Sequence, residues 1–212
     1  MTSPITHHIP EDMIRAYAAG QLAQPFAVVV AAHISICDAC RAEVEAQEML
    51  AGAVLDRVEG VALAQGARDR LMAALETAPP PPPAIRGSGI FPAPIMEALK
   101  GKPPQWKMLG GGIRQQILSA DGEGSLRLLY IPPGRAVPEH GHRGRELTLV
   151  LQGSFADSEG CFRRGDVEAA HDEIDHQPIA GADEPCICLA ATDAPLRFHG
   201  LVPRLLQPIF RI

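Results

Sequence analysis

The sequence contains no apolar run long enough to cross a bilayer, and its first ten residues lack the basic-then-apolar order of a secretory signal. It also lacks an excess of positive charge, because 25 Asp and Glu outnumber 19 Lys and Arg and give a formal net charge of −6. A protein that binds a nucleic-acid backbone needs a basic surface. We therefore expect a cytoplasmic protein that binds neither a membrane nor nucleic acid directly.

A proline-rich segment divides the chain. Five consecutive prolines at positions 79–83 are followed by Gly87 and Gly89. Proline cannot donate a backbone hydrogen bond and favours an extended, semi-rigid spacer. A loop inside one packed core rarely has this composition, so we predict two domains, at residues 1–77 and 94–212, joined by a Pro-rich linker at 78–93.

Before the linker, apolar residues recur three or four positions apart, which predicts helices. The pattern places one helix after Pro10 and others over about 24–36, 38–55 and 67–76. An all-α unit of about 75 residues has only a marginal core. A structural metal would help such a unit to fold.

After the linker, the period of the pattern falls to two. Leu126, Leu128 and Tyr130 alternate with other residues, and the run 146–151 is typical of a strand buried on both faces or nearly so. Glycine and proline recur between the short runs, as at 132–134. Many short strands with regular turn signals predict an all-β sandwich or barrel.

His33, Cys37 and Cys40 form an H-x-x-x-C-x-x-C pattern. His33 and Cys37 are four residues apart and would share one face of a helix, while Cys40 can reach back from the start of the next helix. Tetrahedral zinc needs a fourth ligand, and the spacing leaves His7 and His8 as alternatives. Thiolate and imidazole together favour zinc over magnesium or calcium.

The five cysteines also allow other interpretations. In a reducing compartment, Cys37 and Cys40 can be buried thiols beside a capping histidine. A redox C-x-x-C of the thioredoxin type would need a preceding strand in an α/β unit, and the pattern predicts none there. Cys186 and Cys188 are two apart on an expected strand and face one side of it, either as a redox pair or as small core residues. Cys161 lies apart from both pairs, and we assign it no role.

A second set of ligand-type residues follows Gly134. The spacing G-x5-H-x-H-x3-E-x6-G contains His140, His142 and Glu146 and matches the first motif of the cupins. His140 and His142 are two apart, so both point to the same face of an extended chain. A turn or bulge after His142 would bring Glu146 alongside them.

His176 supplies the fourth ligand of this second set. It lies eleven residues after Gly165, where the second cupin motif has its histidine, although His171 and Glu173 stand where that motif has proline and glycine. Three imidazoles and one carboxylate suit iron, manganese, nickel, copper or zinc. The alternative is a metal-free barrel whose histidines line a binding cavity. We interpret His171 as a loop residue and His199 as a surface residue.

The ligand pattern and the linker resemble those of the zinc-binding anti-sigma factors of the ChrR type. The residues that carry the resemblance are His8, His33, Cys37 and Cys40, and the runs 146–153 and 186–198. The resemblance is nearly full length and implies a cupin (jelly-roll) barrel, His8 rather than His7 as the fourth ligand, and zinc in both sites. It also implies that the helical domain holds an extracytoplasmic-function sigma factor away from RNA polymerase. The cupin-like domain would be needed to release that sigma factor in response to singlet oxygen.

We therefore expect an anti-sigma factor and not an enzyme. Several apolar side chains of the helical domain would contact the sigma factor or else belong to the core: Val28, Val30, Leu71, Met72 and Leu75. Three acidic side chains would face a basic surface of the sigma factor or simply water: Glu43, Glu45 and Glu48. The alternative hypothesis is a metal-dependent cupin enzyme, a dioxygenase or isomerase, that carries a helical oligomerisation domain.

Overall fold

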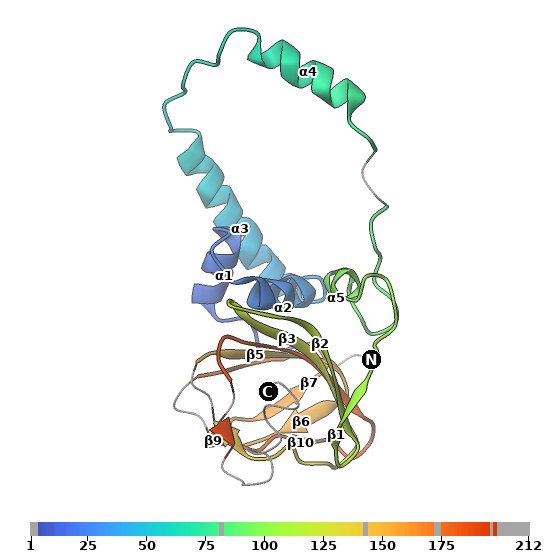
Figure 1. Cartoon of the computed structure of the whole chain (residues 1–212). Helices are drawn as coiled ribbons and strands as arrows, with labels where there is room; N and C mark the ends of the chain where they lie inside the picture. Colours follow the sequence, from blue (N-terminus) through green and yellow to red (C-terminus); the bar gives the residue numbers. More distant parts are fainter. Residues whose placement is uncertain (1–3, 81–82, 142–143, 172–174, 196, 199–212) are drawn as a thin grey trace.

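The computed structural model describes residues 4–80, 83–141, 144–171, 175–195 and 197–198. Helices cover one face of a curved β structure, and a helical arch extends away from both (Figure 1). The expected architecture, N-terminal helices followed by an antiparallel β barrel, is confirmed. The division into domains at 1–77 and 94–212 stays a prediction.

The helices are α1 (Glu11–Ala18), α2 (Gln24–Ile34), α3 (Asp38–Leu55), α4 (Ala67–Thr77) and α5 (Ala93–Ala98). The strands are β1 (Lys107–Gly110), β2 (Ile113–Asp121), β3 (Gly124–Ile131), β4 (His140–Gly141), β5 (Glu146–Gln152), β6 (Ser154–Ala156), β7 (Cys161–Arg163), β8 (Val167–Ala170), β9 (Asp175–His176), β10 (Ile179–Ala180), β11 (Cys186–Thr192) and β12 (Arg197–Phe198). The sequence pattern did not predict α5, which begins at the last residue of the expected linker.

Helix boundaries near the first cysteines differ from the expected ones. Pro10 occupies the N-cap of α1, which fits its fixed φ. α2 ends at Ile34, two residues before the predicted end, and Cys37 becomes the N-cap of α3. The two helices meet at a bend of 118°. His33 and Cys37 therefore lie on either side of a helix corner and not on one continuous helix, which corrects that expectation.

The β region contains one large sheet and two small ones among the described residues. The large sheet has the strand order β1-β2-β3-β11-β5-β8, and the small sheets have the orders β10-β6-β7 and β12-β4-β9. Every pairing between these strands is antiparallel. An inner core fills the space between the large sheet and the β10-β6-β7 sheet, with Val150 and Cys186 on one side and Phe155 and Phe162 on the other.

A second core joins the helices to the outer face of the large sheet. It contains Val29 and Val30 of α2 together with Leu147 and Leu149 of β5, all of them fully buried. Odd-numbered residues of β5 face the helices and even-numbered ones face the barrel interior, so the strand is buried on both faces, as predicted. Val30 is consequently a core residue and not a contact with a partner.

The second half of α3 and all of α4 lie outside both cores. The buried residues of α3 are Cys40 and Val44, near its start, and α4 has no buried residue. Figure 1 shows these helices extending away from the barrel as two sides of an arch. Among the described residues no single helix is long and apolar enough to cross a membrane, although α2 and α3 pass that test together as a pair bent at their junction.

Candidate metal centres

The structure brings His8, His33, Cys37 and Cys40 together at the corner between α2 and α3, and we call this cluster the corner site. Its ligand atoms all lie within 4.8 Å of one another. His8 Nδ1 is 3.4 Å from Cys37 Sγ and 3.5 Å from Cys40 Sγ. Ordinary Zn–N and Zn–S bond lengths separate neighbouring ligand atoms of a tetrahedral site by about 3.6 Å. The donor set and its spacing therefore fit a zinc ion.

His33 provides an independent test of that fit. Its side chain is fully buried in the last turn of α2, and neither ring nitrogen makes a well-formed hydrogen bond among the described residues, although the Gly165 carbonyl lies near the ring. A buried polar atom without a partner is costly, and each such atom needs an explanation. Coordination by one ring nitrogen would satisfy it, so the orphaned imidazole supports a metal at the corner.

The protonation of the corner site depends on its burial. Burial lowers the pKa of His33 to about 4, although the Gly165 carbonyl and the Asp166 carboxylate act in the opposite direction. The ring is therefore neutral near pH 7, as a ligand must be. Burial raises the pKa of Cys40 to about 11, which a backbone N–H from Ile9 partly opposes. A cation at the centre would supply the charge that converts this thiol to a thiolate.

The structure also separates the two N-terminal histidines. His8 points its ring at the cysteines, whereas His7 lies against the barrel. The His7 ring is 4.6 Å from the ring of Phe162, and its Nδ1 is 3.6 Å from Asp166 Oδ2. His8 is thus the member of this pair that lies in the corner site, as the resemblance implied.

Two residues of the second predicted set meet at the open end of the barrel. His140 of β4 and His176 of β9 are directly paired in the sheet, and their ring centroids are 4.7 Å apart. Glu146, at the start of β5, is buried and accepts a hydrogen bond of 2.8 Å from Thr148 Oγ1. His142 lies outside the described residues, so the complete set of four ligands stays a prediction.

Two carboxylates beside His176 were missed by the sequence analysis. His176 Nδ1 lies 2.7 Å from Asp157 Oδ2, just after β6, and 3.1 Å from Glu168 Oε1 on β8. These three side chains are themselves close enough to hold an ion. Metal-bound histidines commonly donate the other ring N–H to a carboxylate or carbonyl. His140 Nδ1 makes a comparable contact of 2.8 Å with the Pro138 carbonyl, so both histidines have Nδ1 against an oxygen acceptor.

The buried carboxylates and His176 shift each other's pKa values. Burial raises the pKa of Glu168 to about 8, against the effect of the nearby histidine. Burial alone would lower the pKa of His176, but Glu168 and Asp157 outweigh it and raise that pKa to about 9. Of these two carboxylates, only Glu168 had a signal in the sequence, as a glutamate on the inward face of a short strand. Asp157 had none, because it lies outside both cupin motifs.

A buried arginine also faces the barrel interior. Arg127 of β3 donates to Gln115 Oε1 at 3.3 Å and to Ser125 Oγ at 2.8 Å. Burial lowers the pKa of its guanidinium, and the charge of Glu146 opposes that effect. The interior of the barrel therefore contains buried charged and hydrogen-bonded side chains as well as an apolar core.

The remaining cysteines and histidines lie outside the two candidate metal centres or outside the described residues. Cys186 and Cys188 are buried in the inner core with their sulfur atoms 3.4 Å apart. Their burial supports the interpretation of both as small core residues. Hydrogen bonding and charge from Cys186, together with burial, raise the pKa of Cys188. Cys161 is exposed on β7 and His171 is exposed in a loop, whereas His199 lies outside the described residues.

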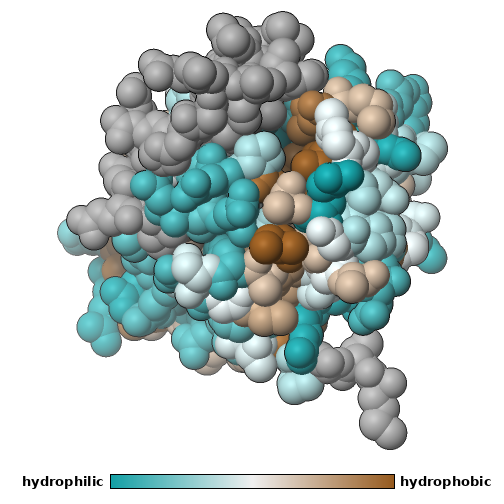
Figure 2. Space-filling view, turned by 90° about the horizontal axis from the view of Figure 1, so that it is seen from below, coloured by the Kyte–Doolittle hydropathy of each residue, from teal (hydrophilic) through white to brown (hydrophobic). Residues whose placement is uncertain are grey.

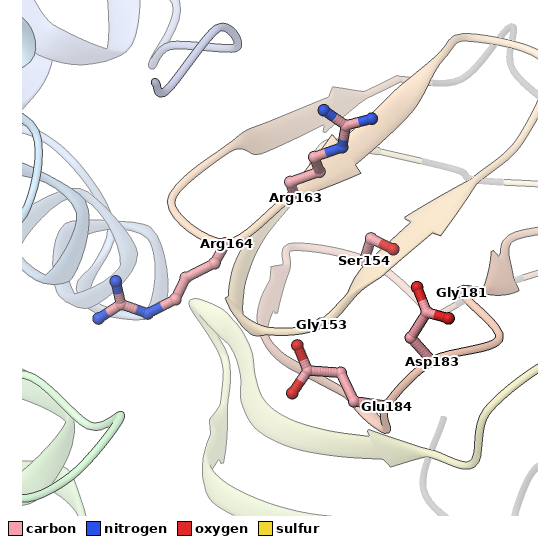
Figure 3. Close-up of a pocket in the computed structure, with 7 residues that line it drawn as sticks. All are labelled: Gly153, Ser154, Arg163, Arg164, Gly181, Asp183 and Glu184. Carbon is pink, nitrogen blue, oxygen red and sulfur yellow. The ribbon is translucent and has the colours of Figure 1, made fainter. Parts of the chain in front are cut away.

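The turn between β7 and β8 also borders a pocket of about 290 Å³. Figure 3 shows Arg163 and Arg164 on one side of it, Asp183 and Glu184 on the other, and Arg164 directed towards the helices. Charges of both signs line this pocket, and no buried donor selects a ligand. Viewed from the side away from the helices, the described residues are mostly hydrophilic with a narrow apolar band (Figure 2).

Comparisons with known proteins agree with this architecture. The family described as the ChrR cupin-like domain matches residues 98–195. The anti-sigma-E factor ChrR of Cereibacter sphaeroides is 47% identical over 211 residues, which cover 98% of this chain and 99% of that protein. A chain in the crystal structure of Rhodobacter sphaeroides SigE in complex with the anti-sigma ChrR matches with 44% identity and a TM-score of 0.79, covering 89% of this chain and 99% of that one. An RmlC-like cupin from Ralstonia eutropha has 20% identity, a TM-score of 0.42 and coverage of 46% and 68%.

Proposed function

Because the chain belongs to the ChrR family of anti-sigma factors, we propose that it binds an extracytoplasmic-function sigma factor and keeps it from RNA polymerase. The relative of known structure was crystallised in complex with SigE. Family membership also removes the reason to retain a cupin enzyme as the alternative. An inhibitor of a sigma factor acts where RNA polymerase acts, so the proposal carries a cytoplasmic location with it.

The observation that carries the proposal is the arch, which we define as residues 49–77. Large apolar side chains of the arch are exposed: Met49, Leu50, Val54 and Leu55 on α3, and Leu71, Met72 and Leu75 on α4. Exposed apolar patches of this kind mark protein–protein interfaces. An eleven-residue helix with no buried side chain is marginal in water, so α4 needs a partner to be stable. A sigma factor seated in the arch would bury these residues.

Acidic residues lie next to the apolar part of the arch. Glu43, Glu45 and Glu48 are exposed on α3, just before the arch begins. Charges at the rim of an interface steer association and select partners more than they add affinity. We propose that these carboxylates face a basic, DNA-reading surface of the sigma factor.

The two candidate metal centres have different roles in this proposal. Zinc in the corner site would hold the bend between α2 and α3, because its ligands come from both helices and from the segment before α1. A metal at His140, His142, Glu146 and His176 would make the barrel the sensor that releases the sigma factor on oxidative stress of the singlet-oxygen type. The pairing of His140 with His176 supports that second site.

The arch is tested by introducing negative charge into its apolar surface. Replacing Leu71 and Leu75 with glutamate should weaken sigma binding at least tenfold and raise sigma-dependent transcription in a reporter strain. The matched control is Met108→Glu, which changes an equally exposed apolar residue on β1. Unchanged binding by the double variant, measured by isothermal titration with purified proteins, would remove the arch from the proposal.

A further inference from the structure

The segment just before α1 is attached to the barrel by one buried carboxylate. Asp166, between β7 and β8, is 2% exposed. Its Oδ1 accepts the backbone N–H groups of Thr6 at 2.7 Å and His7 at 3.0 Å. Its Oδ2 accepts the N–H of Arg163 at 2.8 Å, within its own turn. Asp166 therefore ties the two residues before His8 to a fixed point on the barrel.

Further contacts extend this attachment over residues 5–9, which we call the strap. The His7 carbonyl accepts the N–H of Val167 at 3.1 Å, as in a short strand pairing. Ile5 lies over Gly165, where a Cβ would stand 2.6 Å from the Ile5 side chain and the backbone has a φ of +96°. Ile9, on the other side of His8, is buried in the core. The strap is thus held on both sides of His8.

The same turn of the barrel borders a second ligand of the corner site. The Gly165 carbonyl and the Asp166 carboxylate are the barrel groups that influence the buried ring of His33. Two of the four corner ligands are therefore close to this turn: His8 follows the residue that Asp166 binds, and the ring of His33 lies near the Gly165 carbonyl. Chain ends fray unless they are tied down, and ordering each residue costs conformational entropy. The strap lowers that cost for His8 before any metal binds.

We propose that Asp166 of the barrel is a positioning residue for the corner site and holds His8 in place for the metal through the strap. The inference deepens the proposed function, because it rests on the corner site being a metal site. It makes the corner a joint product of the helical unit and the barrel. Two residues after Asp166 along the chain, Glu168 contacts His176, so the residue that anchors the strap is close in sequence to the candidate barrel centre.

The test measures the corner site directly and does not involve a sigma factor. Asp166→Asn in the full chain replaces one acceptor oxygen with an N–H donor and removes the negative charge, so its hydrogen bonds to the strap and to Arg163 are weakened or lost. We expect zinc release to a chromophoric chelator to be at least tenfold faster than in the wild type. The rate of hydrogen exchange at residues 5–9 should rise, and the melting temperature of the barrel should stay at the wild-type value. The matched control is Asp183→Asn, an exposed aspartate on the rim of the pocket in Figure 3.

A second variant separates the strap from the turn itself. Thr6→Pro removes one N–H donor to Asp166 and leaves the contact between Asp166 and Arg163 intact. Faster exchange at residues 5–9 with an unchanged rate of zinc release in both variants would overturn the proposal. If the wild-type corner holds no zinc, the metal assignment fails separately. Alkylation of Cys37 and Cys40 then decides: a tenfold faster rate in Thr6→Pro supports positioning of His8 by the strap, and an equal rate overturns it.

Discussion

Cys37→Ser should abolish tight sigma binding, whereas Glu146→Ala should leave it measurable. Cys37 is 3% exposed, and its sulfur lies 3.4 Å from His8 Nδ1 in the corner site. Loss of an outer-shell partner alone weakens metal affinity 10–100-fold, so loss of a thiolate ligand should weaken it by at least about 100-fold. At saturating zinc, a hundredfold loss removes about 2.7 kcal/mol of stabilisation from the helical unit. That loss frees the bend between α2 and α3 and should weaken sigma binding at least tenfold.

The Glu146→Ala change acts on the opposite face of the sheet. Glu146 points into the barrel, while the helices rest on the outward side chains of Leu147 and Leu149. We therefore expect sigma affinity within about threefold of the wild type, since surface and interior changes distant from an interface rarely couple to it strongly. Titration calorimetry and metal analysis of both variants provide the assay. Cys161→Ser is the control, because Cys161 is exposed on β7. Equal losses of affinity in Cys37→Ser and Glu146→Ala would refute this division of labour.

Two further predictions concern the core and the barrel centre. Leu149→Ala should lower the free energy of unfolding by about 2–5 kcal/mol in chemical denaturation, because Leu149 is fully buried between α2 and the sheet, whereas exposed Leu50→Ala should change it little. Asp157→Asn should weaken metal binding in the barrel 10–100-fold in a competition titration, because the carboxylate orients His176, and Asp183→Asn should not. Wild-type affinity in Asp157→Asn would show that His176 needs no such support.

Three of the four corner-site residues were predictable as neighbours because they are close in sequence. His33, Cys37 and Cys40 span a single helix corner, so spacing alone was sufficient to bring them together. The choice between His7 and His8 was not predictable from spacing, because it depends on which residue the barrel holds. Asp166 makes that choice by binding the N–H of His7 and leaving His8 directed at the cysteines.

The barrel was predictable in type but not in its interior. Period-two patterning indicated strands, and the cupin spacing indicated His140, His142, Glu146 and His176, of which His142 lies outside the described residues. Asp157 could not be found this way, because it follows β6 in one small sheet and contacts His176 on β9 of the other, and spacing along the chain does not reveal a contact between sheets. The doubly buried strand at 146–151 did contain an unused signal. A strand that is apolar on both faces needs a cover on its outer face, and α2 is that cover.

The covered sheet constrains how a signal can pass from the barrel to the arch. Detaching the helical unit from the barrel would expose Val29, Val30, Leu147 and Leu149, all fully buried at present. Exposing four such side chains costs roughly 6–12 kcal/mol, which is comparable to the whole stability of a typical domain. Loosening the strap breaks three hydrogen bonds, two of them to a carboxylate, at roughly 3.5–7.5 kcal/mol in total. A rearrangement that starts at the barrel centre therefore reaches the corner at lower cost through the strap than by undocking, and the arch can open while α2 stays on the sheet.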